Sequence, residues 1–239
     1  MQIALDFGAV GDVAWMRDRL RERLGQPGPG ALRTPIGQLV KSAISSRTRD
    51  EVSAEAHRRL VAAYPDWSAL AAAPAAAIET VIGDVKHPGN KARHLGAALR
   101  MVAAHRPDFD LAFLGGLGVA DALAWLERLP GVGRKVAAST LNFSTLDMPA
   151  FVIDTHVLRV LCRLGFVRRK ADIHAAYRTV MAAAHRWSAE ELRELHVLMK
   201  RLGQTLCQFD RALCPDCPIR RRCRTAAVSP RGLAHVRAA

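Results

Sequence analysis

Residues 129–135, Leu-Pro-Gly-Val-Gly-Arg-Lys, join two predicted helices through a tight turn. Gly131 and Gly133 can adopt left-handed backbone angles and let a phosphate approach the main chain closely. The helix that follows presents free N–H groups and the positive end of its dipole at the same place. A lone G-x-G turn is common, but this one is followed by an unusual residue. We predict that Gly131, Val132, Gly133 and Arg134 anchor a nucleic-acid backbone without reading its sequence.

That unusual residue is Lys135, in the first turn of the second helix. A cation at this position opposes the helix dipole by about 0.3–1 kcal/mol. The chain contains 29 Arg and only six Lys, so a pure charge role would have favoured arginine. Only lysine can lose its proton and act as an amine nucleophile. An ordinary surface lysine is the alternative, and the position directly after the turn favours the nucleophile.

Nineteen residues further on, residues 152–159 read Val-Ile-Asp-Thr-His-Val-Leu-Arg. Asp154 ends a short apolar stretch, which is a candidate strand over residues 150–153, and precedes a predicted helix. Aspartate is a favoured N-cap, so a capping role is predicted here. Capping is compatible with a second, catalytic role for the same carboxylate.

Four cysteines are clustered near the C-terminus with the spacing C-x6-C-x2-C-x5-C, and they are Cys207, Cys214, Cys217 and Cys223. Four clustered thiols in a chain without a secretory signal indicate a metal site rather than disulfides. Structural zinc usually takes two close pairs, and only one C-x-x-C is present, although zinc stays an alternative. Bacterial ferredoxin runs are spaced differently again.

Three consecutive arginines, Arg220, Arg221 and Arg222, lie between the last two of these cysteines. Anchoring both ends of that loop to one metal site would fix three guanidinium groups in a surface patch, and arginine matches phosphate oxygens bidentately. A solvated charge run is the alternative. The fifth cysteine, Cys162, lies among apolar residues, and we predict a buried core thiol.

The fold class predicted from the pattern is all-α. Half of the residues are apolar, and apolar positions recur at helical spacing with breakers between the runs. Thr48 with Glu51, and Ser188 with Glu191, match the capping-box pattern. Helices are predicted over residues 12–24, 36–44, 48–62, 75–82, 91–104, 119–126, 134–142, 155–164, 172–185 and 190–202.

The chain is strongly basic, with 35 Lys and Arg against 22 Asp and Glu and a formal net charge of +13. Such a surplus favours a nucleic-acid partner, although arginine-rich usage can also reflect genome composition. The first ten residues lack the features of a secretory signal, and no run approaches a membrane span of about 18 apolar residues. We expect a cytoplasmic protein that is not in a membrane.

In order and spacing, these motifs resemble the endonuclease III family of helix-hairpin-helix DNA glycosylases and lyases over roughly residues 34–223. The resemblance implies a six-helix barrel domain over residues 36–147 and a second domain from residues 1–35 and 148–239. The four cysteines have the spacing of that family's [4Fe–4S] loop. A nucleoid-associated monomer is expected, which binds double-stranded DNA containing damaged bases or abasic sites and flips the damaged base into a groove between the domains.

The resemblance also implies residue roles. Lys135 would attack C1′ of the damaged nucleotide, expel an oxidised pyrimidine and form a Schiff base, and β-elimination would then cut the strand. Asp154 would stabilise the cationic sugar and assist proton movement. A DNA-binding paralogue with weak or altered turnover, acting mainly on abasic sites, is the alternative. A glycosylase that uses water instead of lysine is a second one, but it would not need Lys135.

Two positions depart from the family pattern, and both bear on extrusion of the base. Arg47 stands where the family usually carries a glutamine that fills the gap left by the flipped nucleotide. His87 stands where a second loop normally supplies an apolar wedge. We predict that both residues contact DNA, and that the departures alter substrate range rather than reaction type.

Overall fold

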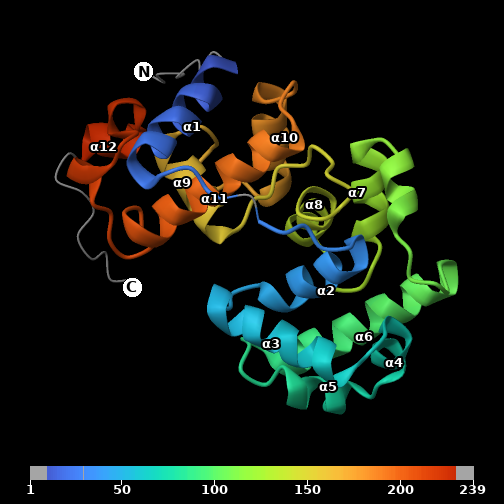
Figure 1. Cartoon of the computed structure of the whole chain (residues 1–239). Coiled ribbons are helices and arrows are strands. Elements are labelled where there is room, and N and C mark those ends of the chain that lie inside the picture. Colours follow the sequence, from blue (N-terminus) through green and yellow to red (C-terminus); the bar gives the residue numbers. More distant parts are fainter. Residues whose placement is uncertain (1–9, 29, 230–239) are drawn as a thin grey trace. The chain divides into compact units, whose positions relative to one another are not determined.

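The computed structural model describes residues 10–28 and 30–229, and this part of the chain contains helices but no β-strand. The all-α prediction is therefore confirmed. The chain divides into two compact units (Figure 1). We call residues 31–148 the hairpin unit, and residues 1–30 together with 149–239 the cysteine unit.

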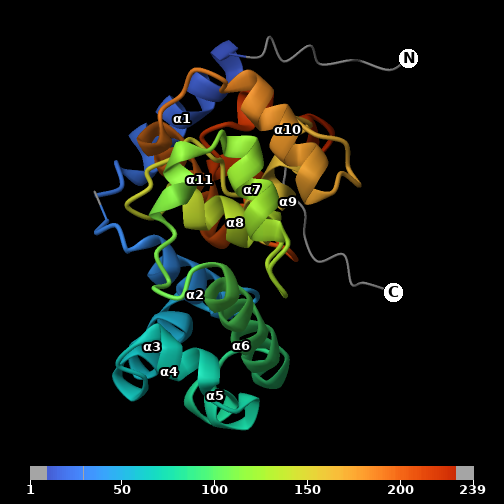
Figure 2. The same cartoon turned by 90° about the vertical axis from the view of Figure 1, so that its right-hand side faces the viewer.

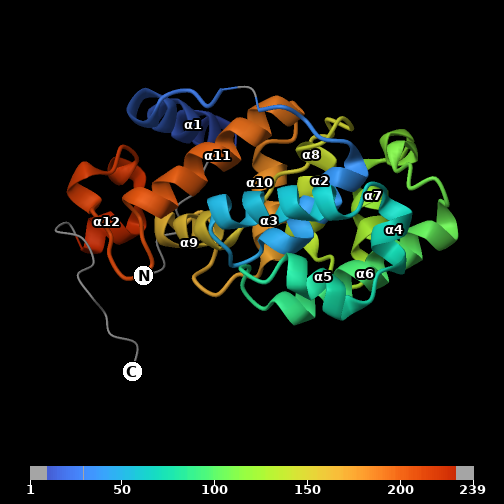
Figure 3. The same ribbon diagram turned by 60° about the horizontal axis from the view of Figure 1, so that its bottom comes forward.

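The hairpin unit is built around α2 (Pro35–Ser45), which contacts α3 (Asp50–Ala63), α6 (Pro88–His105) and α8 (Arg134–Asn142) (Figure 3). Helix α2 begins where the Thr34 hydroxyl accepts a hydrogen bond from Gly37 N and Pro35 occupies the first turn, both favourable start signals. Nearly every residue of α2 is buried, and this unit's core forms around it.

The remaining elements of this unit are three helices that pack on α6 or α8, and one 3-10 turn. They are α4 (Trp67–Ala72), α5 (Ala75–Val81), the 3-10 turn η1 (Ala112–Gly116) and α7 (Val119–Glu127). Helices α4 and α5 contact α6, whereas α7 lies beside α8 (Figure 2).

The cysteine unit contains α1 (Val10–Leu24), α9 (Thr155–Leu164), α10 (Ile173–Ala183) and α11 (Ala189–Thr205). Helix α11 contacts both α1 and α9 (Figure 1). The Ser188–Glu191 capping box at the start of α11 is present as predicted. The cysteine loop adds two 3-10 turns, η2 (Cys214–Asp216) and η3 (Arg220–Arg222), followed by α12 (Arg224–Val228).

Three local predictions are wrong. Residues 150–153 are buried but unpaired with any other strand, so they form no strand. Thr48 does not cap α3: that helix begins after Arg49 without a side-chain cap, because the Thr48 hydroxyl is engaged elsewhere. Cys162 is only partly buried, since the buried face of α9 is formed by its apolar neighbours.

Candidate functional site

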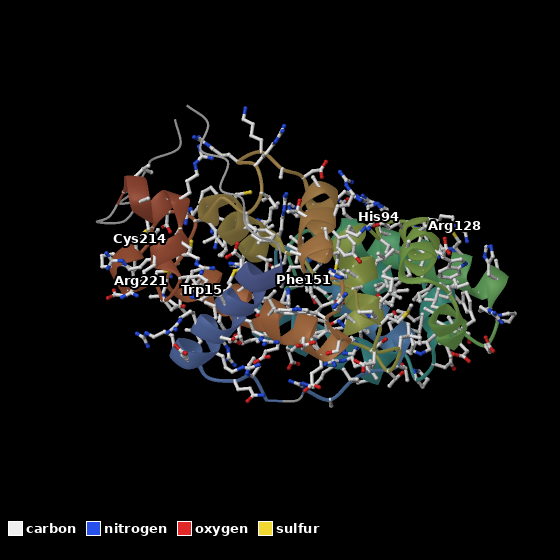
Figure 4. All side chains as sticks on the ribbon, turned by 90° about the horizontal axis from the view of Figure 1, so that it is seen from above. Trp15, His94, Arg128, Phe151, Cys214 and Arg221 are labelled. Atoms are coloured by element: carbon white, nitrogen blue, oxygen red, sulfur yellow. The ribbon has the colours of Figure 1, made fainter. Side chains whose placement is uncertain are left out.

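The turn between α7 and α8 requires glycine at one position for two independent reasons. Gly131 has φ +74°, in the left-handed region that side chains rarely adopt. A Cβ added there would also lie 2.6 Å from the Cβ of His94 on α6. The His94 side chain, labelled in Figure 4, therefore packs closely against the turn, and any larger residue at position 131 would displace it.

The rest of the turn leaves the start of α8 accessible. Gly133 is exposed and a Cβ there would meet nothing within 4 Å, while no side chain caps the helix. The Val132 side chain is buried, which holds the turn against the unit's core. Arg134 makes two charge-assisted bonds to Glu127, at 2.6 and 3.0 Å, which tie its guanidinium back across the hairpin.

Lys135 is half-buried in the first turn of α8, as predicted. A second lysine, Lys91 on α6, lies close enough for the two charges to interact. Burial and the charge of Lys135 together lower the pKa of Lys91 to about 8. A lysine must be neutral to attack as a nucleophile.

Asp154 belongs to the cysteine unit and caps α9 as predicted: its Oδ1 accepts a hydrogen bond from Val157 N at 2.8 Å. Burial raises the pKa of this carboxyl, but the charges of His196 and Lys200 and the Val157 N–H outweigh burial and hold the pKa below its usual range. Asp154 is therefore ionised at neutral pH. Lys135 belongs to the hairpin unit, so the two predicted catalytic residues come from different compact units.

Arg47 and His87 both lie in the hairpin unit, each exposed and each with a left-handed backbone, at φ +54° and +58°. A residue other than glycine at such angles costs about 1–3 kcal/mol and persists only where its surroundings enforce it. His87 directly precedes Pro88, which begins α6. Sequence reasoning identified both positions but gave no sign of their backbone strain.

Thr48 and Lys91 are the residues that sequence reasoning missed. The Thr48 hydroxyl accepts hydrogen bonds from Lys86 N and Lys91 Nζ, at 3.0 and 2.9 Å. Thr48 and Lys91 therefore connect the segment that carries Arg47 to the segment that carries His87. A lysine that follows Pro-Gly-Asn at the start of a helix is expected to be exposed. The neighbouring sequence contains no pattern that predicts its burial.

The four clustered cysteines line one small cavity of the cysteine unit, together with Arg163 of α9, Thr225 of α12 and four apolar residues. Within residues 10–28 and 30–229, no three His, Cys, Asp or Glu side chains converge as they would around one metal ion. Four thiols spread around an apolar cavity fit a [4Fe–4S] cluster, in which each thiolate binds a different iron. The Arg163 guanidinium donates a hydrogen bond to Cys207 Sγ at 3.4 Å and so holds this sulfur at the edge of the cavity.

The three loop arginines have different surroundings. Arg222 pairs with Asp12 and lies over the ring of Trp15, at 4.6 Å from its centroid, so it ties the loop to α1. Arg220 donates one bond to Pro215 O. Arg221 is exposed and makes no hydrogen bond, ion pair or ring contact with any described residue. Figure 4 shows Arg221, Trp15 and Cys214 at the same end of the cysteine unit.

Comparison with known proteins identifies the family. Residues 40–189 match the family described as HhH-GPD superfamily base excision DNA repair protein. An endonuclease III homolog of Encephalitozoon cuniculi (strain GB-M1) is 31% identical over 188 residues, covering 77% of this chain and 76% of that protein. The chain belongs to the endonuclease III family.

Other relatives agree. Endonuclease III of Thermotoga maritima is 28% identical, over 79% of this chain and 82% of that protein. The fold matches a solved structure of a trapped endonuclease III–DNA covalent intermediate with a TM-score of 0.76 and 25% identity, covering 92% of this chain and 98% of that one. None of the described helices is long and apolar enough to span a bilayer.

Proposed function

We propose that this chain is a base excision repair enzyme that removes oxidised pyrimidines from double-stranded DNA and then cleaves the strand. The observation that carries the proposal is the position of Lys135. This half-buried lysine lies near a second positive charge, in the first turn of the helix that follows an open glycine turn. Membership of the endonuclease III family supports the reaction class.

In the proposed reaction, neutral Lys135 Nζ attacks C1′ and forms a C–N bond while the glycosidic bond breaks. The base departs with that bond's electron pair and takes up one of the two protons of the new ammonium. The C1′–O4′ bond then breaks as the nitrogen lone pair forms the C=N bond of a protonated Schiff base, and O4′ takes a proton from water. Loss of a proton from C2′ then forms a C2′–C3′ double bond and breaks the C3′–O bond, so the strand on the 3′ side departs with a 5′-phosphate. Hydrolysis of the imine by water returns the lysine. The ionised carboxylate of Asp154 stabilises the positive charge on the sugar and accepts a proton.

The hairpin backbone at Gly131, Val132, Gly133 and Arg134 binds phosphate in this proposal, while Arg47 and His87 enter the base stack. We further propose that Cys207, Cys214, Cys217 and Cys223 hold a [4Fe–4S] cluster. With a cluster bound, the cysteines would fix both ends of the loop that carries Arg220, Arg221 and Arg222, and the exposed guanidinium groups of this loop would be held ready for DNA. A monomer would suffice for this function.

Borohydride trapping tests the proposal directly, because reduction of the Schiff base leaves a stable enzyme–DNA adduct. The wild-type protein should give adducts on duplexes containing thymine glycol or an abasic site, whereas Lys135→Gln should give none and still bind DNA. Undiminished trapping by that variant would refute Lys135 as the nucleophile. Trapping at abasic sites alone would favour a narrower lyase function, to which the departures at Arg47 and His87 could contribute.

A further inference from the structure

The hydroxyl of Thr48 joins two loops of the hairpin unit. It accepts hydrogen bonds from Lys86 N at 3.0 Å and from Lys91 Nζ at 2.9 Å, and donates to Ser46 O at 3.3 Å. A hydroxyl has one donor and two acceptor positions, so all three are used. One side chain thus connects the segment that carries Arg47 to the segment that carries His87.

Lys91 completes this connection from the first turn of α6. In addition to Thr48, its ammonium donates to the carbonyl oxygens of Ile44 at 2.7 Å and Ser46 at 2.8 Å, both at the end of α2. Lys91 is only 9% exposed, and a buried ammonium is tolerated only when its donors are satisfied. Three donors meet three oxygens, so Lys91 holds the loops together and is not a spare nucleophile.

The bonds enclose both strained residues. Ser46 and Thr48, on either side of Arg47, are both bound to Lys91. His87 follows Lys86, whose N–H is bound to Thr48, and its own carbonyl accepts the N–H of Lys91 at 3.2 Å. Left-handed angles at residues other than glycine require such enforcement. Arg47 and His87 are otherwise exposed, which leaves their side chains available to a ligand.

We propose that Thr48 and Lys91 form a latch that holds Arg47 and His87 as one rigid pair for insertion into DNA, which makes both latch residues positioning residues for base extrusion. The inference rests on the proposed function. Side chains inserted into a base stack must resist the return of the extruded base, and loosely held loops would yield to it. Because the same two residues bond to both loops, loss of either residue should increase the mobility of both loops.

The test compares a reaction that needs extrusion with one that does not. Excision of thymine glycol from a duplex requires extrusion, whereas borohydride trapping on a single-stranded oligonucleotide with an abasic site does not. Thr48→Val removes the hydroxyl but keeps the shape of the side chain, and it leaves the charges of Lys86 and Lys91 in place. Lys91→Met removes the ammonium. Thr80→Val and Arg100→Met are matched controls in the same unit, because Thr80 bonds to Ala76 O and Arg100 to Ala71 O, both outside the two loops.

We expect Thr48→Val and Lys91→Met each to slow duplex excision at least fivefold, with both controls unchanged. Thr48→Val keeps the charge of Lys91 near Lys135, so its single-strand trapping should stay within twofold of wild type. The double variant should be no slower than Lys91→Met alone. A parallel loss by Thr48→Val on both substrates, or undiminished duplex excision by that variant, would overturn the latch. If Lys91→Met does not fold, Thr48→Val decides.

Failure of the proposed function would be visible separately, since the wild-type protein would then trap neither substrate. Hydrogen exchange still tests the latch in that case. In Thr48→Val the amides of residues 45–48 and 85–87 should lose protection together, whereas in Thr80→Val the same amides should keep it. Unchanged protection, or loss in one loop alone, would overturn the latch.

Discussion

The Arg222 guanidinium lies 4.6 Å from the centroid of the Trp15 ring and pairs with Asp12, whereas its neighbour Arg221 has no partner among the described residues. Two adjacent arginines of the cysteine loop therefore have different roles. Arg222 links the loop to α1, and Arg221 is available for phosphate.

Substitution of each arginine by alanine removes the same charge and should separate these roles. Arg221→Ala should weaken binding to any duplex and lower the log–log salt slope by about 0.9, the value for one phosphate contact. Arg222→Ala should instead lower the free energy of unfolding by about 1 kcal/mol through loss of the ring contact and the ion pair. Salt titrations and urea unfolding of both variants provide the check. Equal salt slopes for both variants would contradict the assignment.

Asp154 combines a structural and a proposed catalytic role, which two substitutions can separate. Asp154→Asn keeps an oxygen that can accept from Val157 N, so folding should be retained, but loses the negative charge. Trapping should then slow by about 100-fold. Asp154→Ala should lose the same activity and about 1 kcal/mol of stability as well. If Asp154→Asn traps at the wild-type rate, the carboxylate has no part in the reaction.

The cysteine cavity predicts a metal content that can be measured on purified protein. About four iron atoms per chain and a yellow-brown colour are expected. Cys217→Ser should lose iron, whereas Cys162→Ser is the matched control, since Cys162 does not line the cavity. One zinc and no iron would show that the cysteines form a different site.

His57 on α3 should make stability depend on pH. Burial, followed by the charges of Arg33 and Lys41, lowers its pKa from 6.5 to about 4, and its Nε2 has no hydrogen-bond partner among the described residues. Between pH 6.5 and 4 the unfolded chain therefore binds a proton at His57 that the folded chain does not. The free energy of unfolding is therefore not reduced by His57 above pH 6.5, and it decreases as the pH falls below that value.

His57→Leu should remove that loss. As the pH falls from 7 to 4, the difference in free energy of unfolding between the two proteins should shift in favour of the variant by roughly 1–2 kcal/mol. This figure allows for solvent screening of a half-buried ring. Urea unfolding of both proteins across this range measures the difference. The Asp and Glu residues are the same in both proteins, so the effect of their titration cancels in that difference. A constant difference between the two proteins would mean that His57 titrates normally.

Local signals predicted some elements to the residue. Helices α8 and α9 begin where the sequence indicates, after Gly133 and after Asp154, because glycine and an N-cap carboxylate act on their immediate neighbours. The same logic failed at Thr48, whose hydroxyl bonds to residues 38 and 43 positions away instead of capping α3. Tertiary partners at that distance leave no pattern in a single sequence, which is also why burial of Lys91 could not be predicted.

His87 leads to the last prediction, which concerns the choice of lesion. Flipping a nucleotide costs a few kcal/mol, least for a base that stacks poorly. An apolar wedge replaces lost stacking well, whereas histidine has less apolar surface and favours partial hydration. We therefore expect weaker extrusion of well-stacked lesions than of thymine glycol, which is not planar, or of abasic sites.

The prediction is tested by the ratio of excision rates for thymine glycol and 5-hydroxycytosine, in wild type and in His87→Leu. Because leucine adds apolar surface at the point of insertion, the variant should excise 5-hydroxycytosine faster and bring the ratio closer to one. Leucine must still adopt the left-handed backbone of residue 87, so a stability loss of up to about 1 kcal/mol is expected. That loss affects both substrates equally and leaves the ratio unaffected. An unchanged ratio would show that this loop does not limit extrusion, and discrimination would then have to arise where the flipped base is bound.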